Sequence, residues 1–286
     1  MVAKTGSSSP YFLMTLRRCI PINHRHFKPA LLAAVAFVWA ISLSINRPAQ
    51  ALPAQPAGAS VQVLPAPHSP VGIDYGVILA VRHPWPVSTL KQAVHVTPPA
   101  PFHLYAEAHS HYALLPDHYW PSTSMITVSI HQGQFQSATT FTTGDPRILR
   151  VNLADQTMEA YEGPTRVRVM PVSTGVSPQW KTPTGTFWIY KRVRDDHMTG
   201  GIAGTKDFWD VEHVPYAQYI YQGIAIHGAW WNHQFGIPRS HGCIQLSTAR
   251  VDNARWVWQF AEIGTPVIVY GQTPRGPAGP SPYPAE

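Results

Sequence analysis

Cys243 is the residue with the clearest capacity for chemistry, because it stands in the segment RSHGCIQL between a His-Gly pair and an apolar run. A cysteine can be a nucleophile, a metal ligand or a small buried apolar side chain. A nucleophilic cysteine attacks acyl carbon as the thiolate, and a partner histidine lowers its pKa from about 8.5 into the range of roughly 3.5 to 7.5. We therefore look for a histidine that the fold can bring to Cys243.

Two histidines are candidates for this base. His227 ends the apolar segment GIAIHG, a predicted strand that holds the imidazole on a rigid element, and the carbonyl of Gly228 can orient the ring. His241 lies two residues before the thiol, and residues two apart on an extended segment point the same way. The amides of Gly242 and Cys243 are candidate donors to the oxyanion of a tetrahedral intermediate. Together these groups predict a cysteine acyl-transfer enzyme.

The first 51 residues have the pattern of an export signal. A basic stretch precedes the uncharged run PALLAAVAFVWAISLSI, and Ala49-Gln50-Ala51 matches the small-x-small pattern that a signal peptidase cuts after. An uncleaved membrane anchor is the alternative, although the run is at the short limit of roughly 17 to 25 residues for a spanning helix. Either way we expect the rest of the chain to lie outside the cytoplasm, with membrane contact only through this segment if it is kept.

The export signal also explains the basic charge of the chain. The formal net charge is +6, from 21 Lys and Arg against 15 Asp and Glu, and residues 1–51 hold six Lys or Arg and no acidic residue. Removing those six leaves 15 basic residues and a net charge of zero, which gives no support to nucleic-acid binding. Cleavage also removes Cys19 and leaves Cys243 alone. A single cysteine in an exported protein suggests a reactive thiol, although an inert buried cysteine stays open.

Composition divides the remaining chain into four segments. Residues 52–70 are a Pro/Ala-rich linker, and residues 272–286 are a Pro/Gly-rich tail that we expect to be disordered. Residues 71–142 hold short apolar runs broken by proline, the pattern of a β-sandwich of immunoglobulin-like size. Residues 146–271 continue the strand pattern. The predicted fold class is mainly β: an Ig-like sandwich, then a β-rich domain with one main helix near its C-terminus.

Two elements flank the candidate site in the predicted second domain. Between Ser247 and Gly264, a helical period puts four apolar residues on one face, namely Val251, Ala254, Trp258 and Ala261. Upstream, the Gly-rich stretch 195–207 is predicted to be a mobile loop over the substrate. Aromatic residues also lie on both sides of His227 in the sequence, and they could either line a substrate cleft or belong to the core of the sheet. Those expected to meet substrate are Tyr219, Trp230 and Trp231.

The residues around Cys243 resemble the active-site signature of the L,D-transpeptidases, the YkuD family. The pair His227-Gly228, a gap and the run SHGCI (240–244) carry the resemblance, and the segments PVSTG, KTPTGTF, DFWDVEHVPYAQYIYQGIAIHG and DNARWVWQFAEIGTPVIVY extend it over residues 146–271. The preceding β segment resembles the immunoglobulin-like modules often found in front of that domain. Gln245 stands where the family usually has Asn or Arg. Since Gln keeps a hydrogen-bonding amide, we expect activity to survive with altered substrate preference.

The resemblance implies acyl transfer on peptidoglycan. Cys243 would attack a stem tetrapeptide at the bond to its terminal D-Ala, while His227, oriented by the Gly228 carbonyl, would take the thiol proton and return it to the leaving D-Ala. His241 would support the thiol or the incoming amine, and an amine of a second stem would resolve the thioester into a cross-link. Ser240 and Gln245 join the substrate-binding set. No metal or organic cofactor is implied, the location is the bacterial wall or periplasm, and carbapenems are plausible covalent inhibitors.

Several alternatives stay open beside the cross-linking reaction. Water can resolve the same acyl-enzyme, which gives an L,D-carboxypeptidase, and so can a lipoprotein lysine or a free D-amino acid. A non-catalytic wall-binding module with an inert Cys243 is a second class of function. A metal site is a third class, although the spacing of its candidate ligands forms no compact motif: His213, His227, His233, His241 and Cys243.

Overall fold

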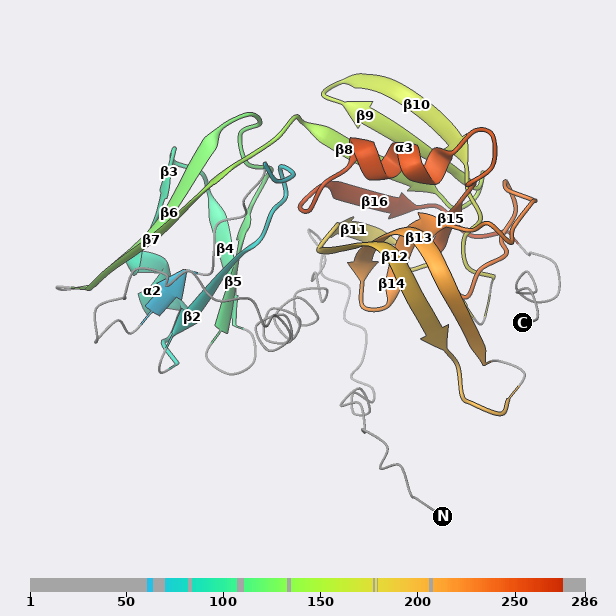
Figure 1. Cartoon of the computed structure of the whole chain (residues 1–286). Helices are drawn as coiled ribbons and strands as arrows, with labels where there is room; N and C mark the ends of the chain where they lie inside the picture. Colours follow the sequence, from blue (N-terminus) through green and yellow to red (C-terminus); the bar gives the residue numbers. More distant parts are fainter. Residues whose placement is uncertain are drawn as a thin grey trace, which may run out of the picture.

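The computed structural model describes residues 61–63, 70–81, 84–106, 111–132, 135–176, 178, 180–205 and 208–274. The predicted export signal lies outside these residues, as do most of the predicted linker and most of the predicted tail. Figure 1 shows two bodies built mainly of strands. In this part of the chain, no helix combines the length and the hydrophobicity of a membrane span.

The N-terminal body contains two antiparallel sheets. The first has the order β1-β2-β5-β4, with the bounds Val61–Val63, Val77–Val81, His111–Pro116 and Phe102–Ala106. The second has the order β3-β6-β7, with the bounds Val94–Thr97, Met125–Gln132 and Phe135–Thr142. Apolar residues of both sheets form one core around Trp120, whose indole nitrogen donates to the Tyr75 carbonyl at 2.7 Å. The predicted β module is therefore present.

One element of the N-terminal body departs from the prediction of strands alone. The helix α2 (Val87–Ala93) begins after Pro86, which stands at its N-cap and has no backbone N–H to leave unsatisfied. The helix buries only Leu90 and Ala93, three residues apart. Two buried positions in seven residues are too few for a helical period to stand out from neighbouring strand patterns.

The C-terminal body also contains two sheets. The five-stranded sheet has the order β10-β9-β8-β16-β11, with the bounds Thr165–Pro171, Thr157–Glu162, Arg147–Asn152, Pro266–Tyr270 and Gly185–Trp188. The four-stranded sheet has the order β12-β13-β14-β15, with the bounds Lys191–Gly200, Trp209–Tyr221, Ile224–Gly228 and Ile244–Leu246. Strands β16 and β8 pair in parallel, and so do β14 and β15. A single apolar core includes residues of both sheets, among them Leu149, Met158, Ile226 and Ile244.

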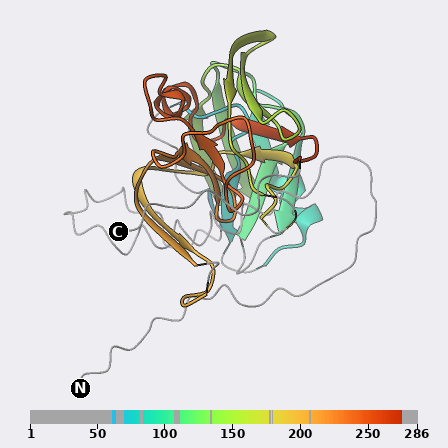
Figure 2. The same ribbon diagram turned by 90° about the vertical axis from the view of Figure 1, so that its right-hand side faces the viewer.

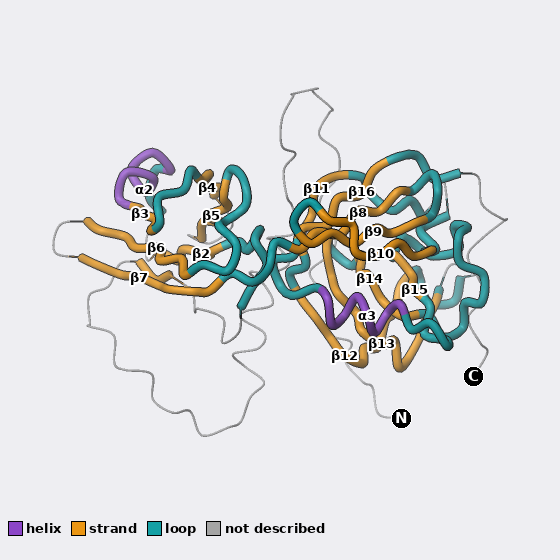
Figure 3. The backbone as a smooth tube through the Cα atoms, turned by 90° about the horizontal axis from the view of Figure 1, so that it is seen from above, coloured by secondary structure: helices purple, strands orange, loops and turns teal. Residues whose placement is uncertain are grey.

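The predicted helix near the C-terminus is α3 (Asn253–Phe260), and Figure 3 shows it in the C-terminal body, away from α2. The Asp252 side chain caps it by accepting from the Arg255 amide at 2.9 Å. Its buried apolar residues are Ala254, Val257 and Phe260. The predicted apolar face was wrong at Val251, which is 60% exposed, because the Asp252 cap starts the helix after it.

Backbone contacts between residues 71–75 and 262–265 join the two bodies. The Gly72 amide donates to the Ile263 carbonyl at 2.7 Å, and the Asp74 amide donates to the Gly264 carbonyl at 2.9 Å. The chains approach so closely that a Cβ on Gly72 would lie 2.2 Å from the carbonyl carbon of Gly264. An apolar cluster of Ala113, Leu115 and Trp188 adds side chains from β5 and β11. The two bodies therefore meet in a specific junction.

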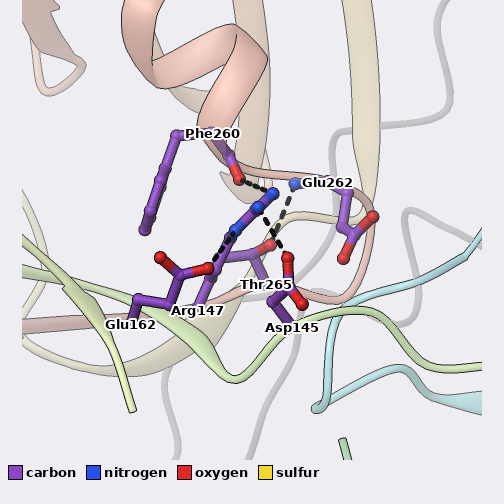
Figure 4. Close-up of polar contacts among 6 residues, drawn as sticks. All are labelled: Asp145, Arg147, Glu162, Phe260, Glu262 and Thr265. Carbon is purple, nitrogen blue, oxygen red and sulfur yellow. Dashed lines mark hydrogen bonds and ion pairs between the residues drawn. The ribbon is translucent and has the colours of Figure 1, made fainter. Parts of the chain in front are cut away.

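Arg147, the first residue of β8, fixes the strand to the end of α3 near this junction (Figure 4). Its guanidinium donates to Asp145 at 2.6 Å and to the Phe260 carbonyl at 3.1 Å, and it forms an ion pair with Glu162 at 3.5 Å. The same group lies over the Phe260 ring, 5.2 Å from its centroid. Glu262 lies close by, and burial raises the pKa of its carboxyl.

Strands β12 and β13 form a long hairpin that projects from the C-terminal body (Figures 1 and 2). The prediction of a loop over 195–207 was wrong for residues 195–200, which belong to β12. Two cross-strand pairs occur in this stretch: His197 with Asp210, and His213 with Asp195 at 3.0 Å. Strand pairing continues as far as Gly200, which pairs with Trp209, although the glycines of this segment suggested a loop.

Candidate active site

A small open pocket is formed by residues of the four-stranded sheet and of the loop between β14 and β15. Its lining residues come from four strands and from the loop before β15: Met198, Trp209, Val211, Val214, His227, Trp231, Ser240, His241, Cys243 and Gln245. The parallel register of β14 and β15 pairs Ile226 with Ile244 and His227 with Gln245. Cys243 immediately precedes β15, so it shares a face with Gln245. The fold thereby brings His227 and Cys243, 16 residues apart in sequence, into one pocket.

His227 is buried and held in one orientation. Its Nδ1 lies 2.8 Å from the Gly228 carbonyl. A carbonyl can only accept, so Nδ1 carries the proton and Nε2 keeps a lone pair for use as a base. Burial lowers the pKa of His227 to about 4, against the opposing effects of the Gly228 carbonyl and the charge of Asp196. At neutral pH the imidazole is uncharged and can accept a proton. The Gly228 contact is the one expected from the sequence.

Cys243 is a protonated thiol in this environment. Its Sγ accepts from the Ala225 amide at 3.4 Å and lies 3.8 Å from the Gly223 carbonyl. Burial raises the pKa of the Cys243 thiol to about 11, and the Ala225 amide offsets only part of this effect. This shift is opposite in direction to the lowering that a partner histidine causes. The cost of removing the thiolate charge from water exceeds the stabilisation of that charge by the Ala225 amide. Neither of these two contacts of the sulfur involves His227.

Ser240 holds the turn that presents Cys243. The Ser240 Oγ donates to the Cys243 carbonyl and accepts from the Gly242 amide at 3.1 Å. Gly242 has a φ of +123°, which L side chains rarely adopt, and the Thr182 Oγ1 donates to its carbonyl at 2.8 Å. Since the Gly242 amide is engaged by Ser240, its predicted part in an oxyanion hole does not fit this geometry. Among the described hydrogen bonds, the Cys243 amide has no acceptor, so it is the better candidate.

His241 packs between the indole rings of Trp180 and Trp209 and is half-buried. Its ring meets Trp180 edge-on at 5.1 Å and stacks on Trp209 at 5.5 Å with an interplanar angle of 21°. These contacts fix the imidazole at the pocket wall, where it can interact with a bound group. The aromatic pattern of the sequence pointed to Trp209 only as part of a general cluster, and Trp180 was not singled out at all.

Gln245 forms part of the pocket floor. It is 1% exposed, and its Oε1 accepts from the Asn232 Nδ2 at 3.0 Å. The oxygen is thus engaged, and the group that Gln245 can offer a ligand is its NH2 donor. Asn232 was not predicted as a site residue. No local spacing rule links it to Gln245, because their contact depends on the folding of the loop between β14 and β15.

The other predicted substrate-binding residues are divided by the structure. Trp231 and Ser240 line the pocket. Trp230 is 45% exposed and lies edge-on to Trp231 at 5.5 Å, outside the lining. Tyr219 is also outside the lining, but it packs with Cys243 against the apolar cluster of the hairpin and donates from its hydroxyl to Asp196 at 2.6 Å. Burial, reinforced by Asp196, raises the pKa of Tyr219, so the phenol stays protonated.

The candidate metal ligands do not form a cluster in the described part of the chain. No three His, Cys, Asp or Glu side chains lie together there as a metal site requires. His213 is instead paired with Asp195 on the exposed face of the hairpin, whereas His227 is buried in the pocket. The described residues therefore offer the metal hypothesis no support.

Comparisons with known proteins relate the C-terminal body to a family. Residues 146–269 match the family model of the L,D-transpeptidase catalytic domain, YkuD. An L,D-transpeptidase from Mycobacterium smegmatis is similar at 24% identity and a TM-score of 0.64, over 74% of this chain and 99% of that one. LD transpeptidase LdtMt1 in complex with imipenem is similar at 25% identity and a TM-score of 0.64, over 73% of this chain and 97% of that one.

A third solved structure extends the same likeness. L,D-transpeptidase 3 from Mycobacterium tuberculosis, with a faropenem-derived adduct, is similar at 24% identity and a TM-score of 0.62, over 73% of this chain and 97% of that one. These matches include the N-terminal β module of the mycobacterial proteins. A sequence search of curated proteins found no match. Residues 146–269 form a YkuD-type L,D-transpeptidase catalytic domain, a member of an enzyme family.

Proposed function

We propose that the protein is a peptidoglycan L,D-transpeptidase that uses Cys243 as its nucleophile. The observation that carries the proposal is the meeting of Cys243 and His227 in one pocket of a domain that matches this family. The substrate is a stem tetrapeptide, and the products are D-Ala and a cross-link between two stems. The buried amide of Gln245, which is held by Asn232, and the ring of His241 supply polar groups of the pocket with which such a peptide can be oriented.

The resting pair is neutral, so the proton moves during the attack. As Sγ of Cys243 bonds to the peptide carbonyl carbon, Nε2 of His227 takes the thiol proton. The Cys243 amide stabilises the oxyanion of the tetrahedral intermediate. The C–N bond to D-Ala then breaks, His227 returns its proton to the leaving amine, and a thioester on Cys243 remains. Attack by an amine forms a new amide bond, breaks the C–S bond and regenerates the thiol.

The same acyl-enzyme has other possible fates. Water gives L,D-carboxypeptidase activity, and a lysine of a wall protein gives covalent anchoring. A non-catalytic wall-binding module is the alternative from another class. It is disfavoured because a binding module has no need of a neutral buried imidazole in the same pocket as a thiol. The relatives in complex with imipenem and with a faropenem-derived adduct support a further proposal, that carbapenems acylate Cys243 of this chain.

The place of action follows from the substrate. Peptidoglycan lies outside the cytoplasm, and the first 51 residues carry the basic, apolar and small-residue pattern of an export signal. We propose that the protein acts in the cell wall or periplasm of a bacterium. The N-terminal body then extends the catalytic domain away from the membrane or binds the wall itself.

The test is the rate of D-Ala release from a stem tetrapeptide. Cys243→Ala is expected to abolish release, and His227→Ala to lower it about a hundredfold or more, as loss of a positioned base does. The matched control is His233→Ala, because His233 is exposed and lies outside the pocket lining. Turnover by the Cys243 variant at the wild-type rate would rule out the proposed nucleophile.

A further inference from the structure

Asp196 is an acidic side chain of the hairpin that the proposed reaction has not used. It lies on β12 opposite Val214, which lines the pocket. Its Oδ2 accepts from the hydroxyl of Tyr219 at 2.6 Å, and its Oδ1 accepts from the His197 amide at 3.1 Å. Both oxygens are therefore held in place, and each still has a free lone pair.

The Tyr219 ring connects this carboxylate to the thiol. Tyr219 and Cys243 pack against the same apolar cluster, which includes Val214 and Ala217. Asp196 also acts to raise the pKa of His227, although burial of the imidazole is the larger effect and lowers it. Tyr219 therefore binds the Asp196 carboxylate through its hydroxyl and packs with Cys243 against one apolar cluster.

Asp196 differs from the neighbouring acids of the hairpin in its partners. Asp195 forms an ion pair with His213, and Asp210 forms one with His197. Among the described residues, Asp196 makes no ion pair, and its side chain is half-exposed. A carboxylate that is held in place and has no ion-pair partner is suited to bind a cation.

Transpeptidation supplies such a cation. The acceptor is a primary amine, which is an ammonium ion in solution at neutral pH, and it must reach the thioester carbon on Cys243. We infer that Asp196, oriented by Tyr219, binds the ammonium group of the acyl acceptor and so favours transfer to an amine over hydrolysis. This inference rests on the proposed function and names the residue that selects its second substrate.

Each proton can be followed through the aminolysis of the thioester. The bound ammonium loses one proton, which neutral His227 can take and release to water. The free amine attacks the thioester carbon, the C–N bond forms, and the C–S bond breaks. The second amine proton passes to the departing sulfur, so that one acyl-enzyme and one ammonium ion give one amide, one thiol and one proton.

The test is the ratio of aminolysis to hydrolysis of one acyl-enzyme, which is independent of how fast that acyl-enzyme forms. The donor is a stem tetrapeptide whose side-chain amine is acetylated, so the acceptor brings the ammonium. The acceptors are D-phenylalanine, which is charged at its amine, and hydroxylamine, which is uncharged at neutral pH. With D-phenylalanine, Asp196→Asn is expected to lower the ratio on the order of tenfold, the worth of a charge-assisted hydrogen bond. With hydroxylamine the ratio is expected to change little.

Two further variants make the result specific. Glu212→Gln removes an equal charge from an exposed position on β13 and is expected to leave both ratios unchanged. Tyr219→Phe keeps the charge of Asp196 but removes its hydrogen bond, and it is expected to lower the D-phenylalanine ratio about threefold. This variant decides the question if Asp196→Asn does not fold.

Three results would overturn the inference. An unchanged ratio with D-phenylalanine would exclude Asp196 from acceptor binding. An equal fall with both acceptors would show that Asp196 only maintains the structure of the site. A wild-type protein that forms no acyl-enzyme would overturn the proposed function together with the inference, whereas an acyl-enzyme with an unchanged ratio would overturn the inference alone.

Discussion

Cys243 and His227 illustrate how burial sets the resting state of a catalytic pair. Burial raises the pKa of the thiol to about 11 and lowers the pKa of the imidazole to about 4. Both shifts have one cause, the cost of charge away from water, and both favour the neutral form. The free protein therefore protects its nucleophile from indiscriminate reaction, and a bound substrate must trigger the proton transfer.

The pH dependence of thiol alkylation tests this resting state. With the pKa of Cys243 raised by burial, the rate of reaction with iodoacetamide is expected to keep rising from pH 7 through pH 9 as the thiolate fraction grows. The urea-unfolded protein is the control, and its rate should level off above the ordinary thiol pKa of about 8.5. A rate for the folded protein that is already constant at neutral pH would indicate a thiolate–imidazolium pair and would contradict this description.

At the scale of elements, the hairpin of β12 and β13 determines what reaches the thiol. It supplies Met198, Trp209, Val211 and Val214 to the pocket, and it also carries Tyr219 and Asp196, which are hydrogen-bonded to each other. Two exposed ion pairs, His197 with Asp210 and His213 with Asp195, lie across its strands. The stability of the hairpin is therefore linked to the charge of these histidines.

Hydrogen exchange across the hairpin tests this link. The paired carboxylates raise the pKa of His197 and of His213 above their ordinary value of 6.5. The stabilisation is therefore complete below pH 6.5 and is lost as pH rises through the raised values. Protection of residues 195–214, corrected for the intrinsic effect of pH, should fall above pH 6.5. A His197→Gln and His213→Gln double variant should remove this dependence; an identical dependence in that variant would mean that other groups cause it.

The parts of the site that sequence could predict are those with local patterns. Cys243, His227 and the Gly228 carbonyl follow from the GIAIHG and SHGC segments, and the strand GIAIHG is β14. The partners contributed by distant strands could not be predicted. The contact of Asn232 with Gln245 and that of Asp196 with Tyr219 depend on loop folding and on strand register, which includes a bulge between Asp196 and Met198. Periodicity identifies strands, but it does not specify such irregularities.

At the scale of the whole molecule, the fold class follows from composition and periodicity, while the junction of the two bodies does not. The junction depends on Gly72, whose missing side chain allows the backbone to approach Gly264. In the sequence, Gly72 is only one glycine near the end of a Pro-rich linker. Close backbone packing of this kind leaves no periodic signal, so the relative placement of the bodies required the structure.

Substitution of Gly72 tests the importance of the junction. In Gly72→Ala the new Cβ would lie 2.2 Å from backbone atoms, so the contact must open. Small-angle scattering should report a larger radius of gyration, while D-Ala release stays within about twofold, because the pocket lies within the C-terminal body. Gly223→Ala is the control for scattering, since its Cβ would meet nothing within 4 Å. An unchanged radius of gyration would show that the junction yields without separating the bodies.

Intact mass spectrometry of the protein with a stem tetrapeptide tests whether Cys243 carries the acyl group. Acyl transfer through this thiol should give a covalent adduct equal in mass to the tetrapeptide acyl group without its terminal D-Ala, located on Cys243 and accompanied by free D-Ala. The Cys243→Ala variant should carry no adduct and release no D-Ala. Release of D-Ala by the Cys243→Ala variant, or an adduct on a residue other than Cys243, would contradict acyl transfer through this thiol.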